Sequence, residues 1–224
     1  TRDSMDSLFD RHFNLELRYD LLARFSSPVR EMELLNLERL SGVTLVEPLF
    51  ELPVRLHYRG RREEALFVGI APGQSLFGMI DANDHPRGLP ASGLLLDWNA
   101  ARKLGARPGD TLEVETLLGK GPSRRAPIVV AGLSRKSVGG ASYLDIGALN
   151  AILRESGLVT GAAIRAEPGE ASTVEKETVD MVNVSSVLSR EREERYLNEN
   201  LAYIRDVASG HIDLNAIDQR RLRA

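Results

Sequence analysis

Histidine is the side chain in this sequence best suited to metal binding or to proton transfer near neutral pH. The chain has four: His12, His57, His85 and His211. No two of them stand four apart or flank a single residue, the spacings that place two imidazoles on one face of a helix or strand. A metal site or a general base needs several polar groups to converge. The spacing therefore predicts neither a metal site nor a histidine-based catalytic centre.

Two short stretches begin like ion-binding loops without completing the pattern. The Asp-x-Asn-Asp run starting at Asp81 begins like a calcium loop, which needs Gly at position six and Glu at position twelve. Those positions hold Pro86 and Ser92. The phosphate loop of nucleotide-binding proteins ends in Gly-Lys-Ser/Thr and opens a helix. Lys120 is instead followed by Gly-Pro, so we interpret the two stretches as a solvated turn and a hairpin loop.

The chain also lacks the usual nucleophile patterns. It has no Cys, which excludes disulfides, thiolate nucleophiles and cysteine-bound metals. The serines at 137–142 do not form the Gly-x-Ser-x-Gly elbow of hydrolases. We therefore predict a non-catalytic protein without a cofactor. An enzyme of unknown class stays a minor hypothesis, and it would require titratable groups that converge in a cleft.

Clustered basic residues are the remaining candidates for a functional surface. The whole chain carries a net charge of −3, which argues against a nucleic-acid partner. Local basic clusters usually lie on solvated turns, but they can also steer a protein partner or contact lipid headgroups. The candidate contact residues are Arg59, Arg61, Arg62, Lys120, Arg124 and Arg125.

Length and hydropathy indicate a folded domain rather than a membrane span. With 224 residues and 42% hydrophobic side chains, the chain can form one large domain or two small ones. It has no apolar run of 18 residues. Because it opens on Thr1 without Met, we interpret it as a soluble segment of a longer protein whose membrane helices flank it on both sides.

The stretch 93–114 has the clearest local pattern. A short apolar strand precedes Asp97, which is suited to cap a helix over 98–104 that ends at Gly105. Pro108 and Gly109 predict a type II turn, and the alternation that follows predicts a half-buried strand.

The rest of the chain predicts alternating strands and helices. Pro48 and Pro53 interrupt one long strand and suggest an edge or a bulge there. The amphipathic pattern of residues 5–13 predicts a helix, and Asp145 is suited to cap another. Further helices are expected from Ser27-Pro28 to Gly42, over 170–181 and over 190–207. Strands are expected over 19–25, 43–58, 65–70, 127–133, 162–166 and 182–188.

This order predicts an α+β fold with two lobes, one split by the other. A first lobe is built from 16–70 plus 158–189 and contains strand-helix-strand units. A β-rich lobe, 87–156, is inserted in it, and residues 71–92 form the crossing. Helices over 1–15 and 190–207 flank the module, and 208–224 is a polar tail.

Five ordered pieces carry a family resemblance: Leu-Ser-Gly-Val at 40–43, Gly-Leu-Leu-Leu-Asp at 93–97, Leu-Gly at 104–105, Pro-Gly-Asp at 108–110 and Val-Val-Ala-Gly at 129–132. Together they resemble the extracytoplasmic (MacB-like periplasmic core) domain of FtsX/MacB/LolC-type ABC transporter permeases, over roughly residues 1–204. The resemblance implies a porter-like split subdomain with the β-rich insert, and flanking helices that continue into the membrane.

The resemblance also implies a function. Such a domain lies on the extracytoplasmic side of the cell (inner) membrane and couples ATP-driven motion to export or extraction of a lipid, peptide or drug-like substrate. Its implied partners are the rest of the permease, a second permease subunit, a cytoplasmic ATPase subunit and, in part of the family, a periplasmic adaptor. Relatives that extract lipoproteins carry a long loop that grips the carrier, and the short connection at 117–127 makes such a hook doubtful here.

A second hypothesis comes from the same stretch. The pattern Ala-x-x-Leu-Gly-x-x-x-Gly-Asp-x-Leu also occurs in double-psi β-barrels, which would make the chain a small-molecule or protein binding module. A barrel alone would not need the flanking strand-helix-strand halves. Folding of 90–135 in isolation would favour this alternative.

Overall fold

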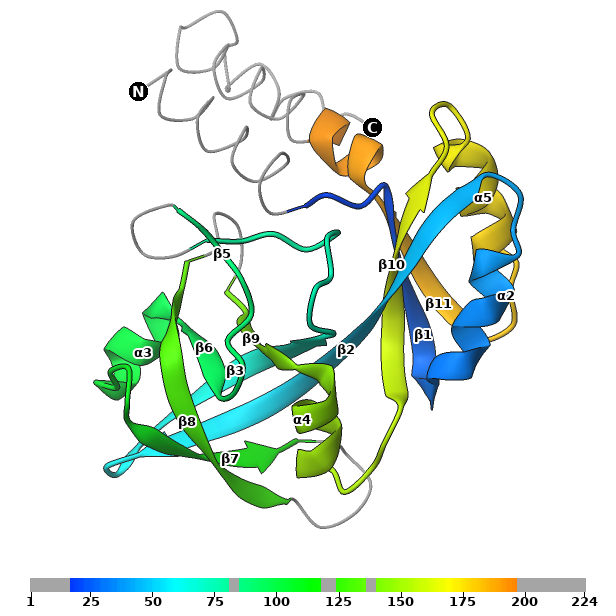
Figure 1. Ribbon diagram of the computed structural model, residues 1–224. Coiled ribbons are helices and arrows are strands. Elements are labelled where there is room, and N and C mark those ends of the chain that lie inside the picture. Colours follow the sequence, from blue (N-terminus) through cyan, green and yellow to red (C-terminus); the bar gives the residue numbers. More distant parts are fainter. Residues whose placement is uncertain (1–16, 81–84, 118–123, 136–139, 197–224) are drawn as a thin grey trace, which may run out of the picture.

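The computed structural model describes residues 17–80, 85–117, 124–135 and 140–196. Strands dominate it (Figure 1). Nine of them form one continuous sheet in the order β11-β1-β10-β2-β3-β9-β6-β8-β7, and β7 pairs in addition with β2. This extra pairing closes part of the sheet into a ring and leaves the rest as an open extension.

The ring contains six strands, all paired with neighbours. They are β2 (Val43–Tyr58), β3 (Arg61–Ile70), β9 (Ser142–Asp145), β6 (Leu94–Asp97), β8 (Arg125–Ser134) and β7 (Thr111–Thr116). Strand β3 runs parallel to β9, and β8 runs parallel to β6. Strands β3 and β6 form one strand-loop-strand unit, and β8 and β9 form the other. The second strand of each unit lies beside the first strand of the other unit: β6 beside β8, and β9 beside β3. The two units are therefore interlocked.

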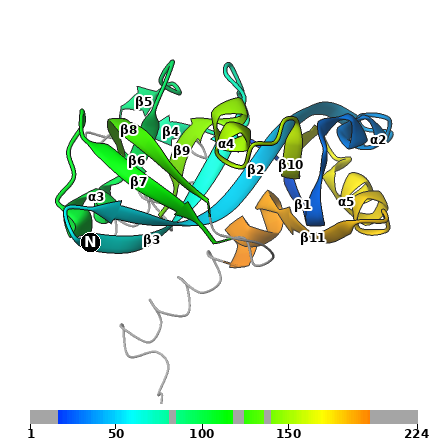
Figure 2. The same ribbon diagram turned by 90° about the horizontal axis from the view of Figure 1, so that it is seen from below.

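The open extension is made by β11 (Val184–Ser189), β1 (Leu21–Arg30), β10 (Leu158–Ala166) and the first half of β2, all antiparallel. Its face turned away from the ring is covered by helices (Figure 2). These are the 3-10 helix η2 (Glu31–Leu34), α2 (Leu35–Glu38) and α5 (Ala171–Val179). Residues 190–196 continue β11 as a helix. The predicted α+β class is confirmed.

Strand β2 belongs to both parts because its partners change along its length. One edge pairs with β10 up to Leu49 and then with β7 from Val54, while the other edge pairs with β3 from Leu49 onward. Pro48 precedes the β3 ladder, and Pro53 falls in the gap between β10 and β7. Each proline therefore lies where one edge of the strand is unpaired, as the sequence suggested.

Two helices of the ring begin and end as predicted. The Asp97 side chain accepts a hydrogen bond from Ala100 N at the start of α3 (Trp98–Leu104), and Gly105 ends this helix at φ 72°. Asp145 caps α4 (Ile146–Ile152) in the same way through Ala148 N. Asp110 N donates to Arg107 O over 3.0 Å, and Gly109 has φ 94° between them, which confirms the predicted turn.

Two expectations are wrong. The helix expected from Ser27-Pro28 begins only at Glu31, because residues 29–30 still pair with β10 and the chain remains extended to Arg30. The boundary expected after residue 70, between the first lobe and the inserted lobe, also does not match the way the strand pairing divides the molecule. Strand β3 lies between β2 and β9 and so belongs to the ring with the inserted residues. Side-chain alternation indicates which face of a strand is buried, but it does not identify the neighbouring strand.

The expected helix over 1–15, the tail 208–224 and the second half of the expected helix over 190–207 lie outside the described residues. In the described part of the chain, no helix is both long enough and apolar enough to cross a membrane.

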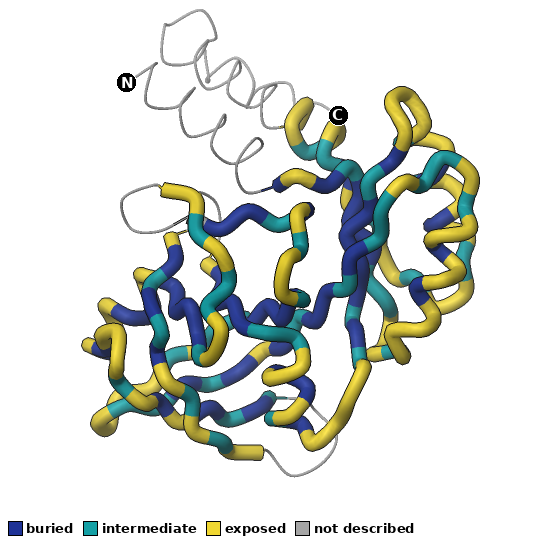
Figure 3. Tube along the Cα trace, viewed as in Figure 1, coloured by how far each residue is buried: buried dark blue, intermediate teal, exposed yellow. Residues whose placement is uncertain are grey.

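Figure 3 marks the buried residues along the chain. Their apolar side chains form the interior of the ring and a second core beside it. Phe67, Leu94 and Leu96 point into the ring, while Val68 and Leu95 belong to the second core. That second core also contains Tyr19 and Ala163 from the open extension, together with residues from the segment 71–80, which we call the strap. The strap ends with the two-residue strand β4 (Met79–Ile80), which pairs with β5 (Pro86–Arg87). The second core therefore joins the two parts of the molecule.

Candidate functional site

The first basic cluster lies at the turn between β2 and β3. Arg59 has φ 47°, and its guanidinium lies 5.0 Å from the centre of the Tyr58 ring. Arg61 donates to the carbonyl of Lys103 over 3.3 Å. The Arg107 backbone N–H donates to the Asp110 carboxylate over 2.8 Å, and this bond, with a further one from Tyr58, lowers the pKa of the Asp110 carboxyl below its ordinary value.

The second basic cluster is held by carboxylates on β7. Arg125 lies 3.0 Å from Glu113 and 3.6 Å from Glu115. The backbone N–H of Arg124 donates to the hydroxyl of Thr116. Ion pairs of this kind on a strand surface are typical of a solvated ladder.

The structure does not bring the predicted contact residues together. Because Val54 pairs with Thr116 and His57 with Glu113, the β2–β3 turn and the β7–β8 connection lie at opposite ends of one strand pair. Arg59, Arg61 and Arg62 are at one end, Arg124 and Arg125 at the other, and Lys120 lies outside the described residues. The five described residues therefore lie in two separate clusters and do not form a single basic surface.

The described histidines are also separate. The Nε2 atom of His57 lies 2.6 Å from an Oε atom of Glu115, in the charged ladder of β2 and β7. His85 lies before β5. Within the described ranges, no group of three His, Asp or Glu side chains is arranged to hold a metal ion.

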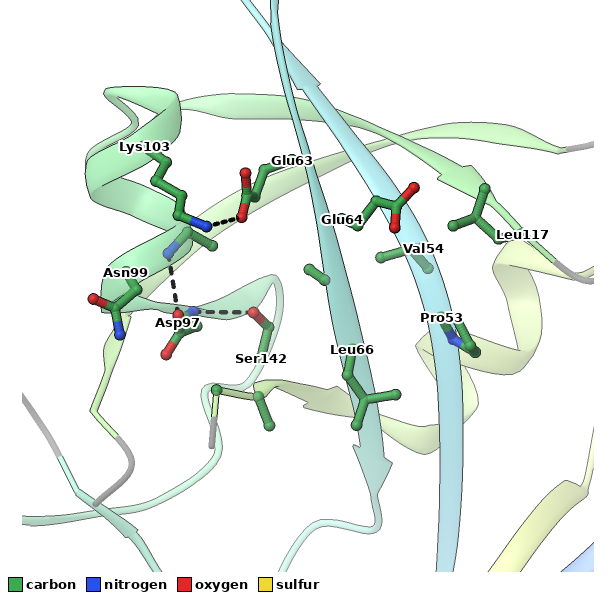
Figure 4. Close-up of a pocket in the computed structure, with 14 residues that line it drawn as sticks. Pro53, Val54, Glu63, Glu64, Leu66, Asp97, Asn99, Lys103, Leu117 and Ser142 are labelled. Atoms are coloured by element: carbon green, nitrogen blue, oxygen red, sulfur yellow. Dashed lines mark hydrogen bonds and ion pairs between the residues drawn. The ribbon is translucent and has the colours of Figure 1, made fainter. Parts of the chain in front are cut away.

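The structure instead shows a groove in the wall of the ring, beside the first half of β3 (Figure 4). Strand β3 pairs with β9 only from Phe67 to Ile70, and α3 lies beside the part that β9 leaves uncovered. The hollow has a volume of about 430 Å³. Its lining alternates between apolar and polar side chains from five elements. They include Pro53, Val54, Glu63, Glu64, Leu66, Asp97, Asn99, Lys103, Leu117 and Ser142.

Half of the polar side chains that line the groove are carboxylates. Lys103 pairs with Glu63, and Glu64 pairs with Arg55 over 2.9 Å from outside the groove. Asp97 is only 8% exposed, and its backbone N–H donates to the hydroxyl of Ser142 over 3.0 Å. Gly140 packs against this carboxylate, since a Cβ at position 140 would lie 3.2 Å from an Asp97 oxygen. The groove therefore carries an excess of negative charge over a partly apolar floor.

Sequence reasoning identified Asp97 only as a helix cap and missed the other groove residues. Glu63 and Glu64 belong to an ordinary charged strand, and Lys103 to the exposed face of a helix. No local signal could have found them, because the groove exists only where β9 stops pairing with β3.

A second hollow, of about 690 Å³, lies where β1 begins and β11 ends. It is lined by Arg18, Arg165 and Arg190 together with carboxylates of Asp20, Glu167, Glu191 and Glu194. The opposite charges nearly cancel, so this hollow has no clear preference for an anion or a cation.

The strap is held on the second core by one buried carboxylate. Glu47 of β2, 7% exposed, accepts hydrogen bonds from Ser75 N (2.7 Å), Ser75 Oγ (3.0 Å) and Leu76 N (2.8 Å). The carbonyl of Leu76 in turn accepts from Arg18 N over 3.0 Å. The Tyr19 ring packs 5.4 Å from Phe77, and burial raises the pKa of the Tyr19 phenol. The start of the described chain is thus tied through the strap to the ring.

Comparisons with known proteins place this architecture in a class. No family model and no curated protein matches the sequence. Among solved structures, the periplasmic region of MacB from Actinobacillus actinomycetemcomitans has a TM-score of 0.53 at 11% identity, over 81% of this chain and 94% of that chain. This likeness shows that the chain has the fold of the MacB periplasmic region.

Two further solved structures have TM-scores below 0.5. The extracellular domain of the ABC-type transporter YknZ from Gram-positive bacteria gives 0.49 at 15% identity, over 70% of this chain and 89% of that chain. A domain of a protein described as a permease from Porphyromonas gingivalis gives 0.38 at 16% identity, over 76% and 87%.

Proposed function

We propose that the chain is the extracytoplasmic domain of an FtsX/MacB-type ABC transporter permease and has no catalytic role of its own. The observation that carries the proposal is the fold shared with the MacB periplasmic region over most of both chains. The ordered motifs between residues 40 and 132 point independently to the same family. In this reading the open extension with its helices corresponds to the porter-like subdomain, and the ring to the inserted one.

The places where the described chain enters and leaves support this proposal. Arg190 N, at the start of the final described helix, donates to Asp20 O over 2.9 Å. Residues 17–20 and 190–194 therefore lie side by side at one end of the molecule (Figure 1). A domain inserted between two membrane helices needs its two connections on the same side.

The contacts of these connections supply a route for mechanical coupling. The first connection contacts the strap, which Glu47 in the extension half of β2 holds on the second core shared with the ring. The second contacts the helical layer, because Arg192 forms an ion pair with Glu175 of α5. Movement of one connection relative to the other would therefore act on both parts of the domain. We propose that this coupling drives export or extraction of a lipid, peptide or drug-like substrate, within a dimeric permease served by a cytoplasmic ATPase and, in some systems, an adaptor.

Surface labelling of the full-length protein tests this proposal. The chain contains no Cys, so Met32→Cys, at a side chain that is 70% exposed, introduces one thiol in this region. We expect a membrane-impermeant maleimide to label that thiol in cells with a permeabilised outer layer, on a protein that sediments with the membrane and copurifies with an ATPase. The unsubstituted protein is the control for background labelling. Labelling only after lysis, or recovery in the soluble fraction, would contradict the proposal.

A second candidate function is a binding module related to double-psi barrels, and the interlocked six-strand ring favours it. The two candidates differ in what must fold together. Residues 90–135 contain β6, β7 and β8 but lack β2, β3 and β9. The isolated fragment should therefore be unfolded by circular dichroism under either candidate, since half of the ring is missing. Residues 43–153 contain all six ring strands, and if they fold and bind a ligand without the open extension, the binding-module candidate moves to first place.

A further inference from the structure

The first half of β3 lacks a strand partner on one of its two sides. Strand β2 pairs with β3 along its full length, from Arg61 to Ile70. On the other side β9 begins only at Phe67, and no other strand of the described chain pairs with residues 61–66 there. Helix α3 lies beside this edge, where the Arg61 side chain donates to Lys103 O, but α3 supplies no strand pairing to residues 61–66. A strand edge without a paired strand is a template for another extended chain.

One hydrogen bond indicates which way the unpaired backbone groups of β3 point. Leu117 N donates to Pro53 O over 3.3 Å, so the backbone groups of Pro53 face β7. Backbone direction alternates along a strand, so those of Val54 face β3, where the register pairs it with Ala65. The neighbours of Ala65 then face the other way. The N–H and C=O groups of Glu64 and Leu66 consequently point toward the groove.

The side chains around this edge define the chemistry of an occupant. Three carboxylates line the groove, from Glu63, Glu64 and Asp97. Lys103 pairs with Glu63 and Arg55 pairs with Glu64, which leaves an excess of one negative charge. Glu64 is 71% exposed and so is accessible to a partner. The floor includes apolar groups from Val54, Ala65 and Leu66. A hollow with a strand edge, an apolar floor and an acidic rim suits an extended peptide with alternating apolar and basic side chains.

We propose that the groove binds an extended segment of a partner protein, which adds to β3 as a strand and places a Lys or Arg side chain among these carboxylates. The acidic rim disfavours anionic lipid headgroups. It also disfavours a second copy of this chain, whose net charge is −3. The inference does not depend on the proposed function, since it follows from the geometry of β3 alone. The two proposals can therefore fail separately. The chain can be a permease domain that does not bind the peptide, or it can bind the peptide without being a permease domain.

A binding assay with defined peptides tests the proposal. The probe is a fluorescein-labelled hexapeptide, Thr-Val-Lys-Val-Lys-Thr, titrated with the full 224-residue chain and followed by anisotropy. We expect it to bind at least tenfold more tightly than a peptide with Glu in place of Lys. A third peptide keeps both Lys residues but has Pro in place of the second Val. It should also bind about tenfold more weakly, because it lacks a backbone donor.

Variants of the chain locate the site. Glu64→Gln should weaken binding about fivefold, while the matched change Glu33→Gln, at an exposed carboxylate on η2, should have no effect. Glu64→Pro removes a donor that faces the groove but leaves the β2 ladder intact, so it should weaken binding further. Circular dichroism establishes that each variant is folded. In nuclear magnetic resonance spectra, the amide signals of Glu64 and Leu66 should shift on titration.

Three results would overturn the proposal. The first is equal binding of the Lys and Glu peptides. The second is binding that Glu64→Gln and Glu33→Gln weaken equally. The third is the absence of saturable binding of the Lys peptide to a chain that circular dichroism shows to be folded.

Discussion

The ring and the open extension use different means to complete their strands. In the ring, each of the six strands has a partner on both sides for part of its length, and the core of the ring is enclosed. In the extension, β11 is the last strand in the sheet, and the apolar face is covered by η2, α2 and α5. Both parts depend on pairings between residues far apart in sequence, and those of the extension, such as Leu21 with Ile164, span more of the chain than those of the ring, such as Phe67 with Ser142. The helices that cover the extension lie next to their strands along the chain.

From this difference we infer where the molecule can bind a partner and where its two parts can move relative to each other. Within the ring, the first half of β3 lacks a strand partner on one side, and this edge coincides with the groove. Between the two parts lies the second core, where Tyr19, the strap and Ala163 meet. The second core and the continuous strand β2 join the ring to the open extension. The following substitutions test the comparison.

The largest expected effect is in the core of the ring. Phe67 is fully buried, so Phe67→Ala should lower the free energy of unfolding by about 4 kcal/mol, through lost apolar contact and the cavity left behind. Urea denaturation measures the change. Leu35→Ala, at a side chain that is 48% exposed, should change stability by less than about 0.5 kcal/mol. Equal losses would contradict the difference between an enclosed ring and an open helical layer.

The link between the two parts should be next in size. Glu47→Ala leaves two backbone donors of the strap, Ser75 N and Leu76 N, without their acceptor, and it should cost about 2 kcal/mol. Hydrogen exchange should accelerate at these two amides far more than in the core of the ring. Glu51→Ala removes a partly exposed carboxylate from the same strand and is the matched control. Uniform acceleration throughout the ring would show that Glu47 supports the whole core rather than the strap.

The two interlocked units of the ring predict a pair of similar effects. Asp97→Ala and Asp145→Ala each remove a helix cap at equivalent positions, and each should cost about 1 kcal/mol. Thermal unfolding of the single and double variants measures this. Asp97→Ala should in addition weaken binding of the Lys peptide, because only Asp97 lines the groove. Equal peptide affinity in both variants would separate Asp97 from the groove.

The smallest effect concerns the exposed turn at the far end of the ring. The lowered pKa of Asp110 means that its ionised form is favoured in the folded state. The stability that the ionised Asp110 contributes to the folded state is therefore present above the ordinary pKa of 3.8. It is lost as the pH falls through the lowered pKa of the folded state. We expect wild type to have a higher Tm than Asp110→Asn at pH 7 and a smaller advantage at pH 3. An advantage that grows on acidification would reverse the assigned sign.

Local features of this fold follow from the sequence because they depend on neighbouring residues. The caps at Asp97 and Asp145, the left-handed end at Gly105 and the turn at Gly109 each need only a few residues in a set order. The positions of Pro48 and Pro53 indicate where β2 lacks a partner, since proline cannot donate to a ladder. The same local rules failed at Ser27, where pairing of residues 29–30 with β10 keeps the chain extended to Arg30.

The pairing partners were decided only by the tertiary structure. Nothing in the sequence of β3 states that it lies against β9, or that this pairing stops at Phe67 and leaves Glu64 facing a groove. Likewise, no pattern around Glu47 shows that it accepts three hydrogen bonds from the strap, 28 and 29 residues further along the chain. Periodicity determined which residues are buried, because burial depends on the face of each element. The neighbours of each face depend on contacts across the whole chain, and these are fixed only when the sheet closes.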